Sequence, residues 1–432
     1  MKPGRTPWLW VPTLYFAEGI PYFIVNNISV IMFKNMGMSN GDLALYTSLL
    51  YLPWVIKPLW SPFVDVIRTK RWWILAMQTV CAAAFAGLAL ALPRPDAAAI
   101  AAQGVPVSAF TVTLIIFYLT ALASATHDIA ADGFYMISLD THSQSVFVGI
   151  RSTFYRIASV FGQGVLVVIA GLLETRTGNV PLAWSITLWA SAALFGCIAL
   201  WHTFSLPKPE TSAAGSRPVS EIFRELGRTF VTFFQKKQVW FAMIFMLLYR
   251  LPEAFSVKML NPFLLDGPGA GGLGLSTETV GLVYGTIGVI ALTAGGILGG
   301  LAAGRWGLKK SLWPMALSLA LPCAVYLYMA VAQPASLWVI SLCVAFDQFG
   351  YGFGFTAYML FMMYFSEGEY KTSHYALCTA FMALSMMLPG MVAGHLQEAM
   401  GYVGFFAMVM VCCLATVAVT FFAKVDPEYG RK

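Results

Sequence analysis

The apolar stretch TALASATHDIAADGFYMIS, residues 120–138, contains three ionisable side chains within a segment of six residues. They are His127, Asp128 and Asp132, and such groups can exchange protons or pair with an opposite charge. Among apolar residues they are costly unless they are paired, protonated or next to water. The stretch therefore predicts a binding or proton-transfer site, provided that the surrounding elements enclose a polar cavity.

The composition identifies the setting as a membrane. The chain has 432 residues, 59% of them hydrophobic and 11% charged, and its mean hydropathy is +0.73. Soluble domains usually carry about 25% charged residues, and several apolar runs here approach the ~20 residues that cross a bilayer. The seven cysteines lie in apolar runs without CxxC spacing, so we expect neither disulfides nor a metal site. We therefore expect an all-α integral membrane protein.

Clusters of proline and glycine divide the apolar runs into twelve expected spans. One long polar connection, 204–238, separates an N-terminal six-helix half (1–203) from a C-terminal half (239–432). From Ser220 onward this connection predicts an amphipathic helix on the membrane surface. The expected spans are 8–33, 42–62, 72–93, 107–137, 149–173, 182–203, 239–264, 277–301, 311–332, 336–365, 375–399 and 401–423.

The distribution of positive charge predicts the orientation. With both termini in the cytoplasm, cytoplasmic segments carry 19 Lys and Arg residues and external loops carry only three: Lys34, Arg94 and Arg176. Cytoplasmic loops of membrane proteins are enriched in these residues. The net charge of +6 is thus explained as an orientation signal, and nucleic acid is not an expected partner.

The two halves look related to each other. Two pairs align without a gap, Tyr15 with Tyr249 and Asn27 with Asn261. Each half also places a glutamate beside a proline near the middle of its first span. Related halves are typical of secondary transporters, which bind solute between them near the middle of the membrane.

Eight charged side chains fall well inside the expected spans. At about 3 kcal/mol each, lipid-facing placement would cost about 24 kcal/mol, more than the whole stability of a domain. They must therefore face a protein interior or a water-filled cavity. They are the acids Glu18, Asp128, Asp132, Glu253 and Asp347, and the bases Arg156, Arg250 and Lys258.

Helical spacing gathers these charges and other polar residues on one face of each of spans 1, 4, 5, 7 and 10, except that Lys258 lies on a different face of span 7. We expect Arg250 and Glu253, one turn apart, to pair. Glu18 is the first choice for a proton site, because no base lies in its own turn. The predicted substrate and proton site comprises Glu18, Tyr22, Asn26, His127, Asp128, Asp132, Tyr135, Arg156, Arg250, Glu253, Lys258, Asp347 and Tyr351.

Plainer roles remain open for several of these residues. Arg156 could form a structural bridge to Asp128 or Asp132, and His127 could be a hydrogen-bonded core histidine. Tyr22, Tyr351 and Tyr358 could serve packing alone. No catalytic or phosphate-binding motif is present in the sequence, so we expect a transporter that needs no cofactor and is driven by an ion gradient.

The segment WSPFVDVIRTKR, residues 60–71, resembles the loop motif that follows the second span of major facilitator proteins. This resemblance implies a cytoplasmic gate in which an acid at a helix end pairs with a basic loop. The gate residues so implied are Asp65, Arg68, Lys70 and Arg71, with Arg305 in the weaker second copy.

Further segments are similar, in chain order, to AmpG-type muropeptide permeases and the related acetyl-CoA transporters, a branch of the major facilitator superfamily. The segments are LYFAEGIPYF, PLWSPFVD, SATHDIAADGF, FYRIASVFGQG, LLYRLPEAF and SHYALCTAFMALSMMLPGMVAGHLQE. The resemblance implies a monomeric, proton-driven importer of N-acetylglucosaminyl-anhydro-N-acetylmuramyl peptides in the bacterial inner membrane.

The resemblance also implies site residues. Asp128, Asp132, Arg156, Arg250 and Glu253 match family positions. This sequence departs from the pattern at His127 and Tyr135, and it adds Glu18 and Lys258. The departures leave open another solute, such as a free sugar, a siderophore or an acyl conjugate, with drug efflux a weaker alternative.

Overall fold

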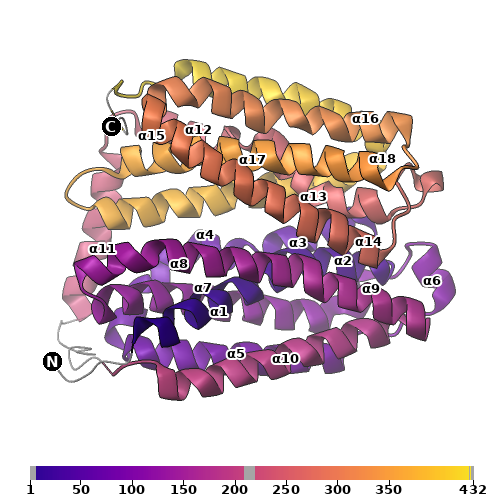
Figure 1. Ribbon diagram of the computed structural model, residues 1–432, viewed down its shortest axis with the longest axis horizontal. Helices are drawn as coiled ribbons and strands as arrows, with labels where there is room; N and C mark the ends of the chain where they lie inside the picture. Colours follow the sequence, from indigo (N-terminus) through magenta and orange to yellow (C-terminus); the bar gives the residue numbers. More distant parts are fainter. Residues whose placement is uncertain (1–5, 209–218, 428, 430–432) are drawn as a thin grey trace.

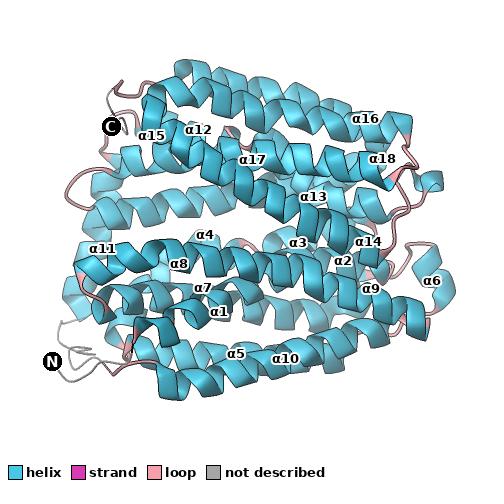
Figure 2. Cartoon of the chain, in the orientation of Figure 1, coloured by secondary structure: helices cyan, strands magenta, loops and turns pink. Residues whose placement is uncertain are grey.

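The computed structural model describes residues 6–208, 219–427 and 429, and within these ranges the regular structure is entirely helical (Figure 2). The elements of the first half are η1 (Pro7–Leu9), α1 (Val11–Phe23), η2 (Ile24–Ile28), α2 (Ser29–Asn35), α3 (Asn40–Leu49), α4 (Leu52–Val66), α5 (Lys70–Ala91), α6 (Ala97–Ala101), η3 (Val107–Phe110), α7 (Thr111–Ser138), α8 (Thr141–Val160), η4 (Phe161–Val165), α9 (Leu166–Thr177) and α10 (Val180–Ser205).

A surface helix, α11 (Val219–Phe234), leads to the remaining elements. These are α12 (Val239–Leu248), α13 (Leu251–Leu265), η5 (Pro268–Ala270), α14 (Thr277–Leu282), η6 (Val283–Gly288), α15 (Val289–Ala320), η7 (Leu321–Cys323), α16 (Ala324–Ala332), α17 (Leu337–Ser366) and α18 (Lys371–Phe422).

Twelve membrane crossings follow from these helices. Nine helical segments of the described chain are long and apolar enough to span a bilayer. Two of them, of 56 and 52 residues, are double length, and each is divided at a glycine with left-handed backbone, Gly307 (φ 75°) and Gly401 (φ 69°). The pair α3 and α4 supplies the twelfth crossing. The all-helical, twelve-span prediction is thus confirmed.

Prolines explain two breaks within single crossings. Pro53 and Pro252 each occupy one of the first two positions of a helix, α4 and α13. Proline lacks an N–H and disfavours helical backbone in the residue before it, so a helix restarts there more readily than it continues. The second break, at Tyr249–Arg250, turns the Arg250 side chain toward the interior.

The helices lie in two groups. Figure 1 shows the elements up to α10 on one side and those from α12 onward on the other, with both chain ends at the same end of the bundle. We call the end of the bundle that carries both chain ends the terminal end. We call the opposite end, which carries the loops at 36–39 and 266–276, the far end. The division into halves 1–203 and 239–432 stays a prediction.

A helix, α11, is present where the amphipathic helix was predicted, and it packs against both groups; its place on the membrane surface stays a prediction. Phe223 makes an edge-on ring contact with Phe63 of α4, and Phe233, fully buried, stacks on Phe381 of α18. Just after the helix, Lys236 Nζ donates to the backbone oxygens of Phe365 (2.7 Å) and Glu367 (2.6 Å). The connection is therefore anchored to the terminal end.

Candidate functional site

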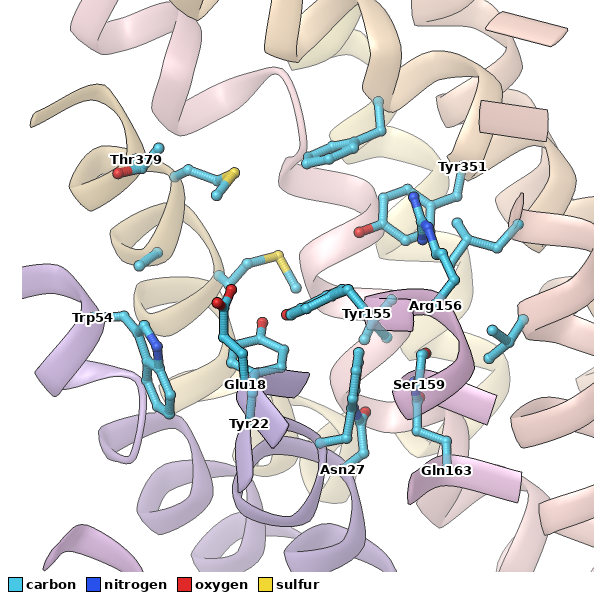
Figure 3. A pocket seen from close by; sticks show the side chains of 18 of the residues that line it. Glu18, Tyr22, Asn27, Trp54, Tyr155, Arg156, Ser159, Gln163, Tyr351 and Thr379 are labelled. Carbon is cyan, nitrogen blue, oxygen red and sulfur yellow. The ribbon is translucent and has the colours of Figure 1, made fainter. Parts of the chain in front are cut away.

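A central cavity of about 520 Å³ lies between the two groups of helices (Figure 3). Glu18 and Tyr155 point into this space, and Arg156 lies next to Tyr351 at its side. The polar and aromatic lining residues are Tyr15, Glu18, Tyr22, Phe23, Asn27, Tyr51, Trp54, Lys57, Ser124, Asp128, Arg151, Ser152, Tyr155, Arg156, Ser159, Gln163, Arg250, Glu253, Tyr284, Gln348, Tyr351, Phe355 and Thr379.

Seven of the thirteen predicted site residues line this cavity together. They come from both groups of helices, as expected for a solute site between related halves. The seven are Glu18, Tyr22, Asp128, Arg156, Arg250, Glu253 and Tyr351. The other six lie outside it: Asn26, His127, Asp132, Tyr135, Lys258 and Asp347. Whether the seven bind solute stays a prediction.

Three π-helical turns shape the cavity wall. They are η2, η4 and η6. Each contributes one lining residue: Asn27, Gln163 and Tyr284, respectively. A π turn inserts one extra residue into a helix and frequently marks a functional site. The extra residue in each turn changes which side chains face the cavity. A prediction based on regular 3.6-residue spacing does not include this change.

The two aspartates of α7 are paired with bases other than Arg156. Lys57 of α4 forms a salt bridge with Asp128, and Arg151 Nη2 of α8 lies 2.8 Å from Asp132 Oδ1. The Arg151 guanidinium also lies over the ring of Tyr15, at 4.4 Å from its centroid. The possible bridge from Arg156 to either aspartate is therefore wrong.

Breaking the Lys57–Asp128 pair is expected to cost about 1–3 kcal/mol of unfolding free energy, because it leaves a largely buried charge unpaired. We predict that Lys57→Met and Asp128→Leu each lower the melting temperature, and that the double variant loses less than the sum. Thermal unfolding of the four proteins in detergent measures this coupling. Additive losses would contradict the pairing.

The predicted pair in the seventh span is present. Arg250 Nε donates to Glu253 Oε2 (2.6 Å) and Arg250 Nη2 to Glu253 Oε1 (3.0 Å). Arg250 Nη2 also donates to the Tyr351 hydroxyl (3.0 Å), and the guanidinium lies 4.7 Å from the ring centroid of Phe355. Two parallel hydrogen bonds make this an oriented pair, so neither charge is free for a ligand in this state.

Arg156 is the exception among the cavity cations. No hydrogen bond or ion pair joins its side chain to another residue of the described chain. Its guanidinium extends toward α15, where Gly296 has no side chain: a Cβ there would lie 3.9 Å from Nη2. An unpaired guanidinium beside a cavity can bind a carboxylate or phosphate bidentately.

Glu18 is the unpaired acid of the same cavity. Its Oε2 is buried and has no hydrogen-bond partner among the described residues. Asp128, whose carboxyl group is within hydrogen-bonding reach of Glu18, and Asp132 are already paired with Lys57 and Arg151. This cluster therefore contains three carboxyl groups and two cations.

Aromatic rings make up much of the remaining wall. Tyr22 and Trp54 meet edge to face with ring centroids 5.1 Å apart, and Tyr51, Tyr155 and Tyr284 add further rings. Aromatic faces offer large apolar area, while phenol and indole groups can hydrogen-bond. Such a wall suits an amphipathic solute with flat apolar faces and polar edges, such as a sugar ring.

His127 is a hydrogen-bonded interior residue. Its Nε2 lies 3.0 Å from Nε2 of Gln78, whose Oε1 lies 2.9 Å from Nδ1 of His202. His202 in turn lies 2.9 Å from the Thr13 hydroxyl. This chain joins four spans, α1, α5, α7 and α10, and it favours the plainer, structural role for His127.

Three more predicted residues do not line the cavity and have hydrogen-bond partners within their own half. Tyr135 donates to the backbone oxygen of Gln144 (2.5 Å). Asp347 accepts from Tyr326 (2.5 Å) and Gln348 (3.1 Å). Asn26 Nδ2 donates to the Tyr22 backbone oxygen (3.1 Å). Helical spacing alone did not anticipate this, because it does not show which polar groups find partners within their own half.

Sequence reasoning missed two lining cations, Lys57 and Arg151. Lys57 lies within a span, which was a usable signal because a charge there is rarely unpaired. Arg151 was counted among the cytoplasmic charges, because it lies only two residues after the expected start of span 5 at 149. The helix begins at Thr141 instead, with the Asp140 side chain accepting from the backbone N–H of Ser143.

The far end is closed by a buried polar network. Lys34 Nζ lies 2.6 Å from Asp266 Oδ1 and donates to Asn40 Oδ1 (2.6 Å). Asn40 Nδ2 donates to Gln397 Oε1 (2.7 Å), and the Tyr402 hydroxyl donates to Asp266 (2.6 Å). Lys34 is thus buried at 3% exposure rather than lying in an open loop.

The cavity opens toward the terminal end. Side chains there are partly exposed, 31% for Arg151 and 41% for Asp132, while the far-end network is buried. Of the predicted gate, Arg71 donates to the Thr203 backbone oxygen (2.6 Å) and Arg68 lies 6.0 Å from the Trp72 ring centroid. The Asp65 side chain lies outside the described structure, and the gate, with Lys70 and Arg305, stays a prediction.

Twelve crossings around a polar cavity closed at one end define an alternating-access transporter fold. The sequence profile of the Major Facilitator Superfamily matches residues 13–388, and the chain belongs to this superfamily. This confirms the predicted fold class and the prediction of a multi-pass transporter rather than an enzyme.

Relatives with similar sequences are named as permeases and transporters. The chain is 24% identical to the anhydromuropeptide permease of Escherichia coli K12 over 426 residues, covering 97% of this chain and 80% of that protein. It is 23% identical to putative transporter AmpG 4 of Rickettsia conorii, covering 93% and 92%. These similarities confirm the resemblance to AmpG-type permeases.

Solved structures support the fold. A D-xylose-proton symporter superposes with a TM-score of 0.73 at 12% identity, covering 98% of each chain. A bacterial homologue of the human lysosomal transporter Spinster, in an inward-facing conformation, gives 0.69 at 15% identity, covering 98% and 96%.

Proposed function

We propose that this protein imports anhydromuropeptides, chiefly N-acetylglucosaminyl-anhydro-N-acetylmuramyl peptides, across the bacterial inner membrane. The observation that carries the proposal is the unpaired Arg156 in a cavity walled by aromatic side chains. The guanidinium suits a carboxylate of the solute, and the rings suit its sugar faces. The similarity to a protein named anhydromuropeptide permease supports the same substrate class.

Proton coupling is proposed from the charge balance around Glu18. Two cations neutralise Asp128 and Asp132, so a third ionised carboxyl would leave the cluster with excess negative charge. A proton on Glu18 removes that excess and lets it donate a hydrogen bond to Asp128. Closing a cavity around a neutral cluster costs less than closing it around a net charge. No cofactor takes part; the gradient supplies the energy.

Transport follows by alternating access. Both termini lie in the cytoplasm in this proposal, so the cavity of this state faces the cytoplasm and the far end faces outward. Rocking of the halves 1–203 and 239–432 about the cavity exposes it to each side in turn. The protein works as a monomer within the bilayer.

Uptake into proteoliposomes tests the proposal. The purified protein is expected to accumulate labelled GlcNAc-anhydroMurNAc-tripeptide when an inward proton gradient is imposed, and to equilibrate it without one. Unlabelled disaccharide should compete. Protein that is folded by thermal unfolding but shows no uptake would contradict the substrate, and another anionic sugar conjugate would then be the class to test.

A further inference from the structure

Lys258 is a buried cation that the proposed cavity does not use. It lies on α13, is 7% exposed, and forms no ion pair with a carboxylate of the described chain. Its Nζ donates to Thr47 Oγ1 (3.0 Å) and lies 5.6 Å from the ring centroid of Tyr51. The Thr47 hydroxyl proton is already given to the Leu43 backbone oxygen (2.6 Å), so its oxygen can only accept here.

This lysine joins the two groups of helices. Thr47 belongs to α3 and Lys258 to α13. Gly390 of α18 packs against both: a Cβ there would lie 3.1 Å from Lys258 Cε and 2.3 Å from Ser48 Oγ. The Lys258–Thr47 hydrogen bond therefore crosses the boundary between the two groups of helices. We call this boundary the seam, and it must part when the far end opens.

A small chamber surrounds the ammonium group. The chamber is about 10 Å³ in volume, room for roughly one water molecule. It shares four wall residues with the main cavity: Asn27, Tyr51, Val257 and Met386. Two buried acceptors, Oδ1 of Asn26 and Oδ1 of Asn261, lack partners in its wall. The chamber is thus a compressed polar extension of the cavity toward the far end.

We propose that Lys258 with Asn26 and Asn261 forms a second anion subsite, which receives the carboxylate of the solute when the far end is open. Parting the halves breaks the bond to Thr47 and widens the chamber. The freed ammonium then attracts the carboxylate, while the amide oxygens accept from hydroxyl or amide N–H groups beside it. The inference rests on the proposed function and adds a separate entry site to it.

The arrangement gives the anion two successive partners. Among the described residues, Arg156 in the cavity and Lys258 beside it are cations without a carboxylate partner, whereas Lys57, Arg151 and Arg250 are paired. Closure of the far end returns Lys258 to Thr47 and leaves only about one water's volume at the subsite. The anion must then leave, and Arg156 in the larger cavity is the unpaired cation that can take it.

Uptake from the external side by right-side-out membrane vesicles tests the subsite. The probes are labelled GlcNAc-anhydroMurNAc with its lactyl carboxylate free, and the same compound with that group converted to an amide. Wild-type protein is expected to show a lower KM for the acid. Lys258→Met should reduce this preference about tenfold, the worth of one charge-assisted hydrogen bond.

Two matched variants distinguish the effect of the Lys258 charge from the effect of its hydrogen bond across the seam. Lys258→Arg keeps the charge and should keep the preference for the acid. Thr47→Val removes the bond across the seam but not the charge, and should also keep it. A preference for the acid that survives Lys258→Met would overturn the proposal. An equal loss of that preference in Thr47→Val would also overturn it, because the hydrogen bond rather than the ammonium charge would then be responsible.

Wild-type protein that transports neither probe would contradict the proposed function, and the subsite then has a separate test. Lys258→Cys should react with a membrane-impermeant thiol reagent added from the external side, beyond the background of Lys258→Ser. Complete protection of Cys at this position would overturn the inference, since a residue that never faces that side cannot receive a solute from it.

Discussion

Gly394→Leu is expected to abolish substrate accumulation while the protein stays folded. A Cβ at this position of α18 would lie 1.8 Å from the backbone oxygen of Asn40 and 2.4 Å from its carbonyl carbon. These are backbone atoms of α3, on the other side of the seam, and they cannot move aside as a side chain tip can. Contacts inside each group of helices are left as they are.

This steric overlap destabilises the state in which the far end is closed. Once α3 and α18 part, a leucine at this position faces open space, so the variant is held with its far end open. A ligand or mutation shifts a two-state equilibrium by its differential effect on the two states, and about 5.5 kcal/mol suffices to invert a 99:1 population. An overlap of this depth with backbone exceeds that, so uptake should fall to background.

A reporter cysteine and a control glycine make this result decisive. Ser48→Cys replaces a buried hydroxyl at the seam with a thiol of similar size, and its labelling from outside should rise sharply in the Gly394→Leu background. Gly300→Leu is the control, because a Cβ at Gly300 meets nothing within 4 Å. Normal accumulation by Gly394→Leu, or a thiol that stays protected, would contradict the role of this contact.

The fold followed from the sequence because its main determinant is the length of apolar runs. Spans of the required length were visible despite irregular ends, and the amphipathic pattern from Ser220 onward located the start of α11 within one residue. The π turns were invisible, since η2, η4 and η6 differ from α-helix by a single inserted residue. Periodicity over a whole span averages such a local change away.

The site was harder to predict than the fold because charge pairing depends on which helices meet. Asp128 and Asp132 were recognised as needing partners, but Arg156 is nearer in the sequence than Lys57 and was therefore the natural candidate. Lys57 reaches Asp128 because α4 packs against α7. No one-dimensional pattern contains that contact, whereas the need for a partner follows from electrostatics alone.

Glu18→Gln is expected to lose gradient-driven accumulation and to retain exchange. One proton moving down a gradient of one pH unit supplies about 1.4 kcal/mol, which supports about tenfold accumulation of a co-transported solute. Glutamine has the size of a protonated glutamate and its amide can donate to Asp128, so the cluster stays neutral in every step. The halves can then still rock, but no proton is carried with the solute.

Two assays on the same proteoliposomes separate these steps. In the variant, the accumulation ratio under the gradient should fall from about ten to about one, while counterflow of labelled against unlabelled disaccharide continues. Glu221→Gln, an exposed glutamate of α11, is the matched control and should accumulate normally. Undiminished accumulation by Glu18→Gln would assign the proton to another carboxyl. Loss of counterflow as well would show that Glu18 is needed to bind or move the solute, because a neutral side chain of the same shape would then have failed at a step that involves no gradient.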